Sequence, residues 1–387
     1  MTWRIPLADI DLDQEEISAV TDVLASKWLS MGSQTQAFEE EFAKRINARH
    51  AIAVANGTAA LHLACMAIGL KPGDQAIVPA LTFVATANAI RYTGAEPIFA
   101  DINGEDDLNI SPEAIERQIN EKTRAILVVH YGGYACDMPR IMAIAEKHNL
   151  RVIEDAAHAV TSSLKDRYMG TWGDIGCFSF FSNKNMTTGE GGMVVTNDDE
   201  LAKKLRLLRS HGMTSLSWER HQGHAFSYDV VDLGYNYRLD EVRAAIGRVQ
   251  LKKIDKNNAI RRERSALYRD LLQEYTPAVG LPFSDHPGVS AAHLMPILLP
   301  DDVDRKLFME AMKNKGIQTS IHYPPIHKFS AFKSSNSAVQ AQVPQTERAA
   351  MREVTLPLFH SLSEQDVHYI AESIRDILNG NEVYKAL

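Results

Sequence analysis

The stretch FSFFSNKNMTTGEGG, residues 178–192, carries the strongest structural pattern in this 387-residue chain. It places Lys184 between a short apolar run and a glycine-rich turn, and a further apolar run, GMVVTND, begins at residue 192. The segment VIEDAAHA, 29 residues upstream of Lys184, places Asp155 at the end of another apolar run. Apolar runs of this length that end in turns are typical of buried strands. We therefore expect Lys184 and Asp155 at strand ends of one sheet.

A lysine and an aspartate in these positions suit one cofactor. A lysine amine can form a Schiff base with the carbonyl of pyridoxal 5′-phosphate (PLP), and a carboxylate can hold the protonated nitrogen of its pyridine ring. We therefore take Lys184 and Asp155 as the candidate catalytic residues. Each has an ordinary alternative when it is considered alone, because most lysines lie on the surface and an aspartate before a helix is often an N-cap.

Composition narrows the class of protein. The length favours two domains, and 45% hydrophobic and 23% charged residues are ordinary for a globular protein. A net charge of −8 without a basic block argues against nucleic acid or an anionic membrane as a partner. The three cysteines are odd in number and far apart, which favours a reducing, cytoplasmic location over a disulfide framework. The N-terminus lacks the pattern of a signal peptide, and no apolar run is long enough to span a bilayer.

Strand and helix patterns alternate over the first two thirds of the chain. Helical patterns at 58–70, 85–94, 111–120 and 138–149 separate most of the strand-like runs. Several of these runs lack polar alternation, as strands buried on both faces do. The predicted fold class is therefore α/β, with a mostly parallel sheet. The expected strands cover residues 51–56, 75–80, 96–102, 124–131, 150–155, 176–181 and 192–198.

The last third has a different organisation. A long helical pattern runs from residue 239 to about 275, followed by expected strands at 293–300 and 316–323 and helices at 302–316 and 363–380. This pattern predicts a smaller α+β domain. We place the large α/β domain at residues 1–245 and the small C-terminal domain at 246–387.

Further polar and aromatic residues follow the expected strands. Gly57 and Thr58 open a helix, whose free backbone amides would receive a phosphate, although a plain helix cap is the more frequent explanation of such residues alone. Phe83 follows the next strand and would stack on a flat ring, yet a lone aromatic there is more often part of a core. His158 would face the same site as Asp155, and Ser179 would donate to the phosphate. Considered alone, His158 is more often a core or surface histidine whose hydrogen bonds are made to other groups of the protein.

Ordered sequence blocks identify a family. WLSMGSQTQAFEEEFA, NGTAAL, PALTFVATANAI, VHYGG, EDAAHA, SFFSNKNMTTGEGG, LGYNYRLDE and IHYPPIH run through nearly the whole chain. In this order they resemble the DegT/DnrJ/StrS family of PLP-dependent sugar aminotransferases. The resemblance implies the aspartate-aminotransferase fold (fold type I), with a mostly parallel seven-stranded sheet in the large domain.

The resemblance also implies residue roles. Lys184 would bind PLP covalently and later move a proton, and Asp155 would pair with the ring nitrogen. Many family members read SFHPxK before the lysine, whereas Phe181-Ser182-Asn183 stand here, which affects the substrate side only. The other implied cofactor contacts are His158 at the ring oxygen, Phe83 stacked on the ring, and Gly57, Thr58 and Ser179 at the phosphate. Asn236 would reach the phosphate of a neighbouring subunit, so a homodimer with shared sites is implied, and His322, Tyr323 and His327 would line the substrate side.

The implied reaction moves an amino group from glutamate or glutamine to a keto group of a nucleotide-linked deoxysugar. A cyclitol ketone as acceptor, a sugar dehydratase and a non-catalytic regulator remain alternatives. Relatives that act as dehydratases have histidine in place of the lysine, so Lys184 argues against that branch. Nicotinamide and P-loop nucleotide motifs are missing from the sequence. His221 and His224 lack a third ligand, so no metal site is expected.

Overall fold

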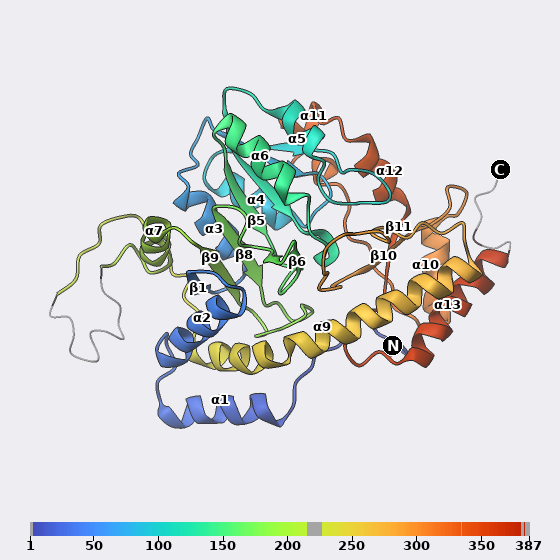
Figure 1. Cartoon of the computed structure of the whole chain (residues 1–387), viewed down its shortest axis with the longest axis horizontal. Coiled ribbons are helices and arrows are strands. Elements are labelled where there is room, and N and C mark those ends of the chain that lie inside the picture. The colour runs from blue at the N-terminus through green and yellow to red at the C-terminus, as the bar shows by residue number, and fades with distance from the viewer. Residues whose placement is uncertain (1–2, 215–226, 334, 381–382, 384–387) are drawn as a thin grey trace.

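A seven-stranded sheet forms the centre of the larger part of the molecule (Figure 1). The structure is a computed structural model, and it describes residues 3–214, 227–333, 335–380 and 383. The strand order is β1-β9-β8-β5-β4-β2-β3. Only β9 pairs antiparallel to its neighbours, so the other strands of this sheet run in one direction. The strands are β1 (His50–Val54), β2 (Gln75–Pro79), β3 (Glu96–Ala100), β4 (Thr123–Val129), β5 (Arg151–Asp155), β8 (Ile175–Ser179) and β9 (Gly192–Thr196).

Helices cover both faces of this sheet, which explains why its strands lack polar alternation. Along β1, Ala51 and Ala53 face one core and Ile52 and Val54 face the other. The first core includes residues of α2 (Ser33–Arg45), α5 (Pro112–Gln118), α6 (Met138–His148) and the start of α9 (Glu241–Tyr275). The second includes residues of α3 (Gly57–Ala67), α4 (Val84–Tyr92) and α7 (Asp199–Arg209). The predicted α/β class and all seven strands of the sheet are confirmed.

Polar side chains cap two of the helices that follow strands of this sheet, α3 and α5. The side chain of Asn56 accepts a hydrogen bond from the backbone of Ala59, and Ser111 caps α5 with Pro112 at its first position. Because the parallel strands all end at one edge, the first turns of α3 and α4 open at that edge. A short 3₁₀ turn, η1 (Tyr131–Gly133), and a small hairpin of β6 (Ser163–Leu164) and β7 (Arg167–Tyr168) complete this region.

The C-terminal third forms a second, smaller core around a two-stranded sheet. β10 (Met295–Leu298) pairs antiparallel with β11 (Glu353–Leu356). The expected strand at 316–323 is wrong, because this segment makes only the isolated bridges of Ile317 with Ile5 and of Ser320 with Thr355. The other elements here are α10 (Arg305–Asn314), η2 (Ile326–Lys328), α11 (Asn336–Val339), α12 (Pro344–Arg352) and α13 (Glu364–Asn379).

Helix α9 joins the two parts without a break (Figure 1). Its first half packs beside α2 and α1 (Gln14–Ser26), and Ile254 belongs to the core of the large sheet. Further along, Tyr268 belongs to the C-terminal core, which also contains Ile5 from the start of the chain. The division at residues 245 and 246, which lies near the start of α9, therefore remains a proposal. The two cores favour a boundary further along this helix, between Ile254 and Tyr268, and Ile5 places the start of the chain with the small domain.

Two general expectations can be compared with the structure. Cys65, Cys136 and Cys177 are all buried free thiols. In the part of the chain that the structure describes, every helix is too short or too polar to cross a bilayer.

Candidate active site

A cavity of about 470 Å³ lies at the edge where the parallel strands end. Residues that follow β1, β2, β5 and β8 line it, as the parallel order of these strands requires. Nine of the eleven predicted site residues line it. The predicted residues that meet in this cavity are Gly57, Thr58, Phe83, Asp155, His158, Ser179, Lys184, His322 and Tyr323.

Lys184 is placed by the connection between β8 and β9. Its backbone amide donates to the carbonyl of Phe181 at 2.9 Å, and Thr188 closes the turn by donating to the carbonyl of Phe180. Burial lowers the pKa of Lys184 to about 8, and the nearby Asp155 carboxylate opposes this shift. Near neutral pH the lysine therefore contains a much larger share of uncharged, nucleophilic amine than a solvent-exposed lysine does.

Asn185, the next residue, fixes the backbone of the lysine. Its side-chain amide donates to the Oδ1 of Asn258 on α9 at 2.6 Å and to the carbonyl of Ala291 at 2.7 Å. Its Oδ1 accepts a hydrogen bond from Nδ1 of His293 at 2.8 Å. Two segments distant in sequence, α9 and residues 291–293, thus hold the residue beside Lys184. The sequence analysis did not single out Asn185 or its partners.

Asp155 ends β5 and is 6% exposed. Its Oδ2 accepts a hydrogen bond from the hydroxyl of Thr86 at 2.7 Å, and its Oδ1 accepts one from the amide of Ala157 at 3.1 Å. Burial raises the pKa of Asp155, whereas these two donors and the charge of Lys184 lower it. The two donors therefore orient the carboxylate and stabilise its ionised form. Thr86 was missed because a buried threonine in a helix has no distinctive sequence pattern.

The start of α3 lies against the end of β8. A Cβ added to Gly57 would lie only 2.8 Å from the Cβ of Ser179, so this close approach requires glycine. The Oδ1 of Asn56 caps the amide of Ala59, which leaves the amides of Gly57 and Thr58 at the cavity. Free amides at a helix N-terminus, together with the nearby hydroxyls of Thr58 and Ser179, form an anion site suited to a phosphate.

The far wall of the cavity is aromatic. Phe83 is 54% exposed, and its ring lies 5.9 Å from that of Tyr323. His158 accepts a hydrogen bond at Nδ1 from the amide of Gly132 at 3.3 Å, and its Nε2 lies 3.1 Å from the Tyr323 hydroxyl. Burial and the charge of Lys184 keep the pKa of His158 well below its usual value. His158 is therefore neutral, with its proton on Nε2, which donates to Tyr323.

Two predicted site residues lie outside the cavity. Asn236 is exposed and forms an isolated bridge with Ser210, which fits a residue that would act in another subunit. His327 is 7% exposed, and its Nε2 contacts Glu347 at 2.9 Å rather than the cavity. Its role on the substrate side remains a prediction that this geometry does not favour.

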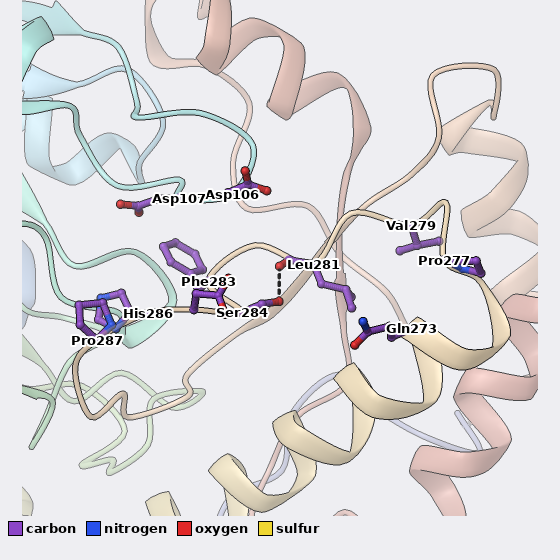
Figure 2. A pocket seen from close by; sticks show the side chains of 11 residues that line it. Asp106, Asp107, Gln273, Pro277, Val279, Leu281, Phe283, Ser284, His286 and Pro287 are labelled. Atoms are coloured by element: carbon purple, nitrogen blue, oxygen red, sulfur yellow. Dashed lines mark hydrogen bonds between the residues drawn. The ribbon is translucent and has the colours of Figure 1, made fainter.

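A second cavity, of about 580 Å³, lies elsewhere in the molecule (Figure 2). It is bordered by Asp106, Asp107 and Asp285 and by the segment around Phe283, and none of the predicted site residues lines it. No group of three or more potential metal ligands occurs in the part of the chain that the structure describes. His221 and His224 lie outside the described residues.

The first cavity fits PLP in three separate respects. It offers an amine with a lowered pKa at Lys184, an oriented carboxylate at Asp155, and an anion site made by the start of α3. The amine and the carboxylate influence each other electrostatically, since each alters the pKa of the other. This combination supports covalent attachment of an aldehyde cofactor and transfer of a proton by the released amine.

Comparisons with known proteins agree with this geometry. The chain is 41% identical over 385 residues to the spore coat polysaccharide biosynthesis protein SpsC of Bacillus subtilis, covering 98% of this chain and 97% of that protein. Among solved structures, PseC of Helicobacter pylori, an aminotransferase involved in the biosynthesis of pseudoaminic acid, has a TM-score of 0.90 at 31% identity, covering 97% of this chain and 99% of PseC. The PLP form of the putative sugar aminotransferase Spr1654 of Streptococcus pneumoniae has a TM-score of 0.89 at 27% identity, covering 97% and 98%.

These similarities confirm fold type I, the fold of PLP-dependent sugar aminotransferases. They also confirm that the chain is an aminotransferase. The family model matches residues 10–375, and this chain is a member of the DegT/DnrJ/EryC1/StrS aminotransferase family.

Proposed function

We propose that this protein binds PLP covalently at Lys184 and transfers an amino group from glutamate or glutamine to a keto group of a nucleotide-linked deoxysugar. The observation that carries the proposal is the pairing of Lys184 and Asp155 in one cavity, with the start of α3 and Ser179 beside them. The pKa of Lys184, lowered to about 8, suits an amine that must alternate between a covalent bond and proton transfer.

Each residue of the site has a defined task in this proposal. PLP supplies an electron sink when it is bound. Asp155 holds a proton on the ring nitrogen, and the hydroxyl of Thr86 orients the carboxylate and favours its ionised form. The amides of Gly57 and Thr58 and the hydroxyl of Ser179 bind the phosphate. Lys184, once released as a neutral amine, would act as the general base that takes a proton from the α-carbon of the amino donor and as the acid that gives it back.

The sugar acceptor is supported by the relatives and by the lining of the cavity. SpsC is a spore coat polysaccharide biosynthesis protein, and PseC is an aminotransferase involved in the biosynthesis of pseudoaminic acid. No arginine lines this cavity among the described residues, so these residues provide no guanidinium to bind the carboxylate of a keto acid through two hydrogen bonds. His322 and Tyr323 supply neutral hydrogen-bonding groups there, which suit sugar hydroxyls.

The proposal includes a homodimer with shared sites, located in the cytoplasm. Val230, Val231 and Leu233 are 55%, 56% and 76% exposed, and they precede Asn236 in the same segment. An exposed apolar run of this kind is typical of a surface that a partner covers. The three free cysteines suit a reducing compartment.

Cofactor attachment is tested by borohydride reduction. The reduced protein should carry the mass of PLP on the peptide that contains Lys184, and a label on another lysine would contradict the assignment. Asp155→Asn should still bind PLP but lose most of its rate with glutamate, because the ring nitrogen then lacks an anionic partner. Near-normal turnover in that variant would remove Asp155 from its role.

The acceptor is tested with the protein in its amino-loaded form. Panels of nucleotide-linked keto sugars, free keto acids and cyclitol ketones are added in turn, and recovery of the original absorbance is followed. Fast recovery with a nucleotide-linked sugar supports the proposal, whereas recovery with a cyclitol ketone alone makes that ketone the acceptor. A protein whose spectrum never responds to glutamate or glutamine would instead fit the regulator alternative.

A further inference from the structure

A buried chain of hydrogen bonds connects the cavity to the small domain. The Nδ1 of His322 lies 2.8 Å from the hydroxyl oxygen of Thr355 on β11. The same hydroxyl is hydrogen-bonded to the Oε1 of Glu353, whose Oε2 accepts from the backbone amide of His322 at 2.8 Å. Tyr131 holds the other side of the residue by donating to the carbonyl of His322. The imidazole is therefore fixed at its backbone and at one ring nitrogen.

The remaining ring nitrogen of His322, Nε2, has no hydrogen-bond partner among the residues that the structure describes, and the residue lines the cavity. Glu353 and Thr355 are each only 1% exposed, so water does not interrupt the chain behind the ring. Burial and the charge of Lys184 lower the pKa of His322 to about 4, so at neutral pH its imidazole carries a single proton.

Two arrangements of protons satisfy this chain. When Glu353 is ionised, the Thr355 hydroxyl donates to Oε1, Nδ1–H of His322 donates to the hydroxyl oxygen, and Nε2 presents a lone pair. When Glu353 is protonated on Oε1, it donates to the hydroxyl oxygen, the hydroxyl donates to Nδ1, and Nε2 carries the proton. The two arrangements differ by one proton, which Nε2 exchanges with the cavity. The bond between His322 and Thr355 and the bond between Thr355 and Glu353 both reverse their direction.

We propose that Glu353, acting through Thr355, sets which nitrogen of His322 carries its proton, and so decides whether His322 donates or accepts a hydrogen bond in the cavity. The proposal deepens the function stated above and rests on it only for the identity of the ligand. Under neutral conditions His322 donates through Nε2–H, so it recognises an oxygen acceptor on the substrate, such as a carbonyl or a ring hydroxyl. Glu353 and Thr355 are positioning residues in this scheme.

The surroundings of Glu353 favour the protonated arrangement at neutral pH. Burial raises the pKa of Glu353 to about 8, although Thr355, the amide of His322 and the charge of Arg305 lower it. Tyr131 and Tyr323 also face this group, and their own pKa values are raised, so both remain neutral. His158 and His293, near His322, are likewise neutral because burial keeps their pKa values well below the usual one.

The test measures the tautomer directly. Protein carrying ¹⁵N-labelled histidine is titrated from about pH 6 to 10, since the nitrogen shifts distinguish a protonated from an unprotonated ring nitrogen. The signals of His322 are identified by their loss in His322→Gln. In the wild type, the proton should move from Nε2 to Nδ1 with a midpoint near pH 8, the pKa of Glu353.

Three variants separate a relay from a merely structural role. Glu353→Gln always donates to the Thr355 hydroxyl, so the proton should stay on Nε2 across the whole range. Thr355→Val keeps the shape but lacks the hydroxyl, so the pH-dependent exchange should disappear. Thr355→Ser restores the hydroxyl and should restore the exchange. A wild type without tautomer exchange, or an exchange in Glu353→Gln or Thr355→Val with the wild-type midpoint, would overturn the proposal.

A kinetic measurement links the relay to substrate recognition. With the acceptor that the panel identifies, the KM of the wild type should rise about tenfold between about pH 7 and pH 9, and the KM of Glu353→Gln should stay nearly constant, because only the wild type loses the Nε2–H donor of His322 when Glu353 ionises. The half-reaction with the amino donor reports separately on Lys184 and Asp155. The tautomer experiment requires no turnover, so a failure of the proposed function leaves it intact, and a failure of the relay leaves the aminotransferase assignment intact.

Discussion

Replacing Thr86 with valine removes one hydroxyl group beside Asp155 and leaves the shape of the side chain nearly unchanged. Thr86 is fully buried on α4, and its Oγ1 donates to the Oδ2 of Asp155 at 2.7 Å. Without PLP, the Asp155 carboxyl of the variant can compensate for the missing hydrogen bond by taking up a proton, since burial already raises its pKa. When PLP is bound, its protonated ring nitrogen needs Asp155 in the ionised form. The missing hydrogen bond should therefore lower the affinity of the protein for PLP.

The size of the effect follows from the type of bond. A hydrogen bond to a charged group contributes about 1.5–3 kcal/mol, and the low exposure of Asp155 leaves little water to replace it. Because about 1.4 kcal/mol corresponds to a factor of ten, Thr86→Val should weaken PLP binding by about 10- to 150-fold. The variant should also lose turnover with glutamate, because a less firmly held carboxylate stabilises the ring proton less well.

The dissociation constant is measured by titrating PLP into cofactor-free protein and following absorbance at neutral pH. Thr86→Ser keeps the hydroxyl and should bind nearly normally. Thr93→Val is a matched control at the end of the same helix, where the buried hydroxyl donates to the neutral carbonyl of Ile90 at 2.7 Å. It should lose some stability but keep its affinity for PLP.

Wild-type affinity in Thr86→Val, with unchanged folding, would refute the assigned role of this hydroxyl. Equal weakening in Thr86→Val and Thr93→Val would show that both act only through the stability of α4.

Three further predictions concern other parts of the site. Gly57→Ala should weaken PLP binding at least tenfold, because the new Cβ would lie 2.8 Å from a neighbouring side chain. The control Gly380→Ala, whose new Cβ would have no atom closer than 3.4 Å, should bind PLP normally, as measured by titrating PLP into cofactor-free protein. The free energy of unfolding of the wild type should fall by up to about 5 kcal/mol relative to Glu353→Gln as the pH rises from 4.5 to 8, since the folded protein binds the extra proton in that range; parallel pH profiles from denaturant unfolding would contradict this. Mixed Lys184→Ala and Asn236→Ala subunits should regain part of the lost activity if sites are shared, and no recovery after proven subunit exchange would argue against a shared site.

The sequence predicted the parts of the fold that local patterns determine. Each strand of the large sheet is a short run of buried residues that ends in a turn or a helix cap, so periodicity and caps were sufficient. The segment 316–323 alternates apolar and polar residues as a strand would, yet tertiary contacts leave it with isolated bridges only. The partner that β10 does use, β11, was missed because it is four residues long and directly follows α12.

The candidate site was predictable where a residue belongs to a motif next to a strand end. Lys184, Asp155 and Gly57 meet in one cavity for that reason. Thr86 and Glu353 were not predictable, because their importance depends on contacts across 69 and 31 residues of sequence that no local pattern records. The same limitation explains His327, which lies near the substrate segment in sequence but turns toward Glu347 in space.

The anchoring of Asn185 by three hydrogen bonds to two distant segments has a consequence for the entropy of the reaction. The backbone beside Lys184 is already ordered by hydrogen bonds to Asn258, Ala291 and His293, so it does not need to rearrange when the amine leaves its covalent bond. Only the rotations of the lysine side chain become free, a gain worth at most about 2 kcal/mol. Recapturing the amine costs no more than this, because no loop must be ordered again. Successive turnovers can therefore begin from the same backbone geometry.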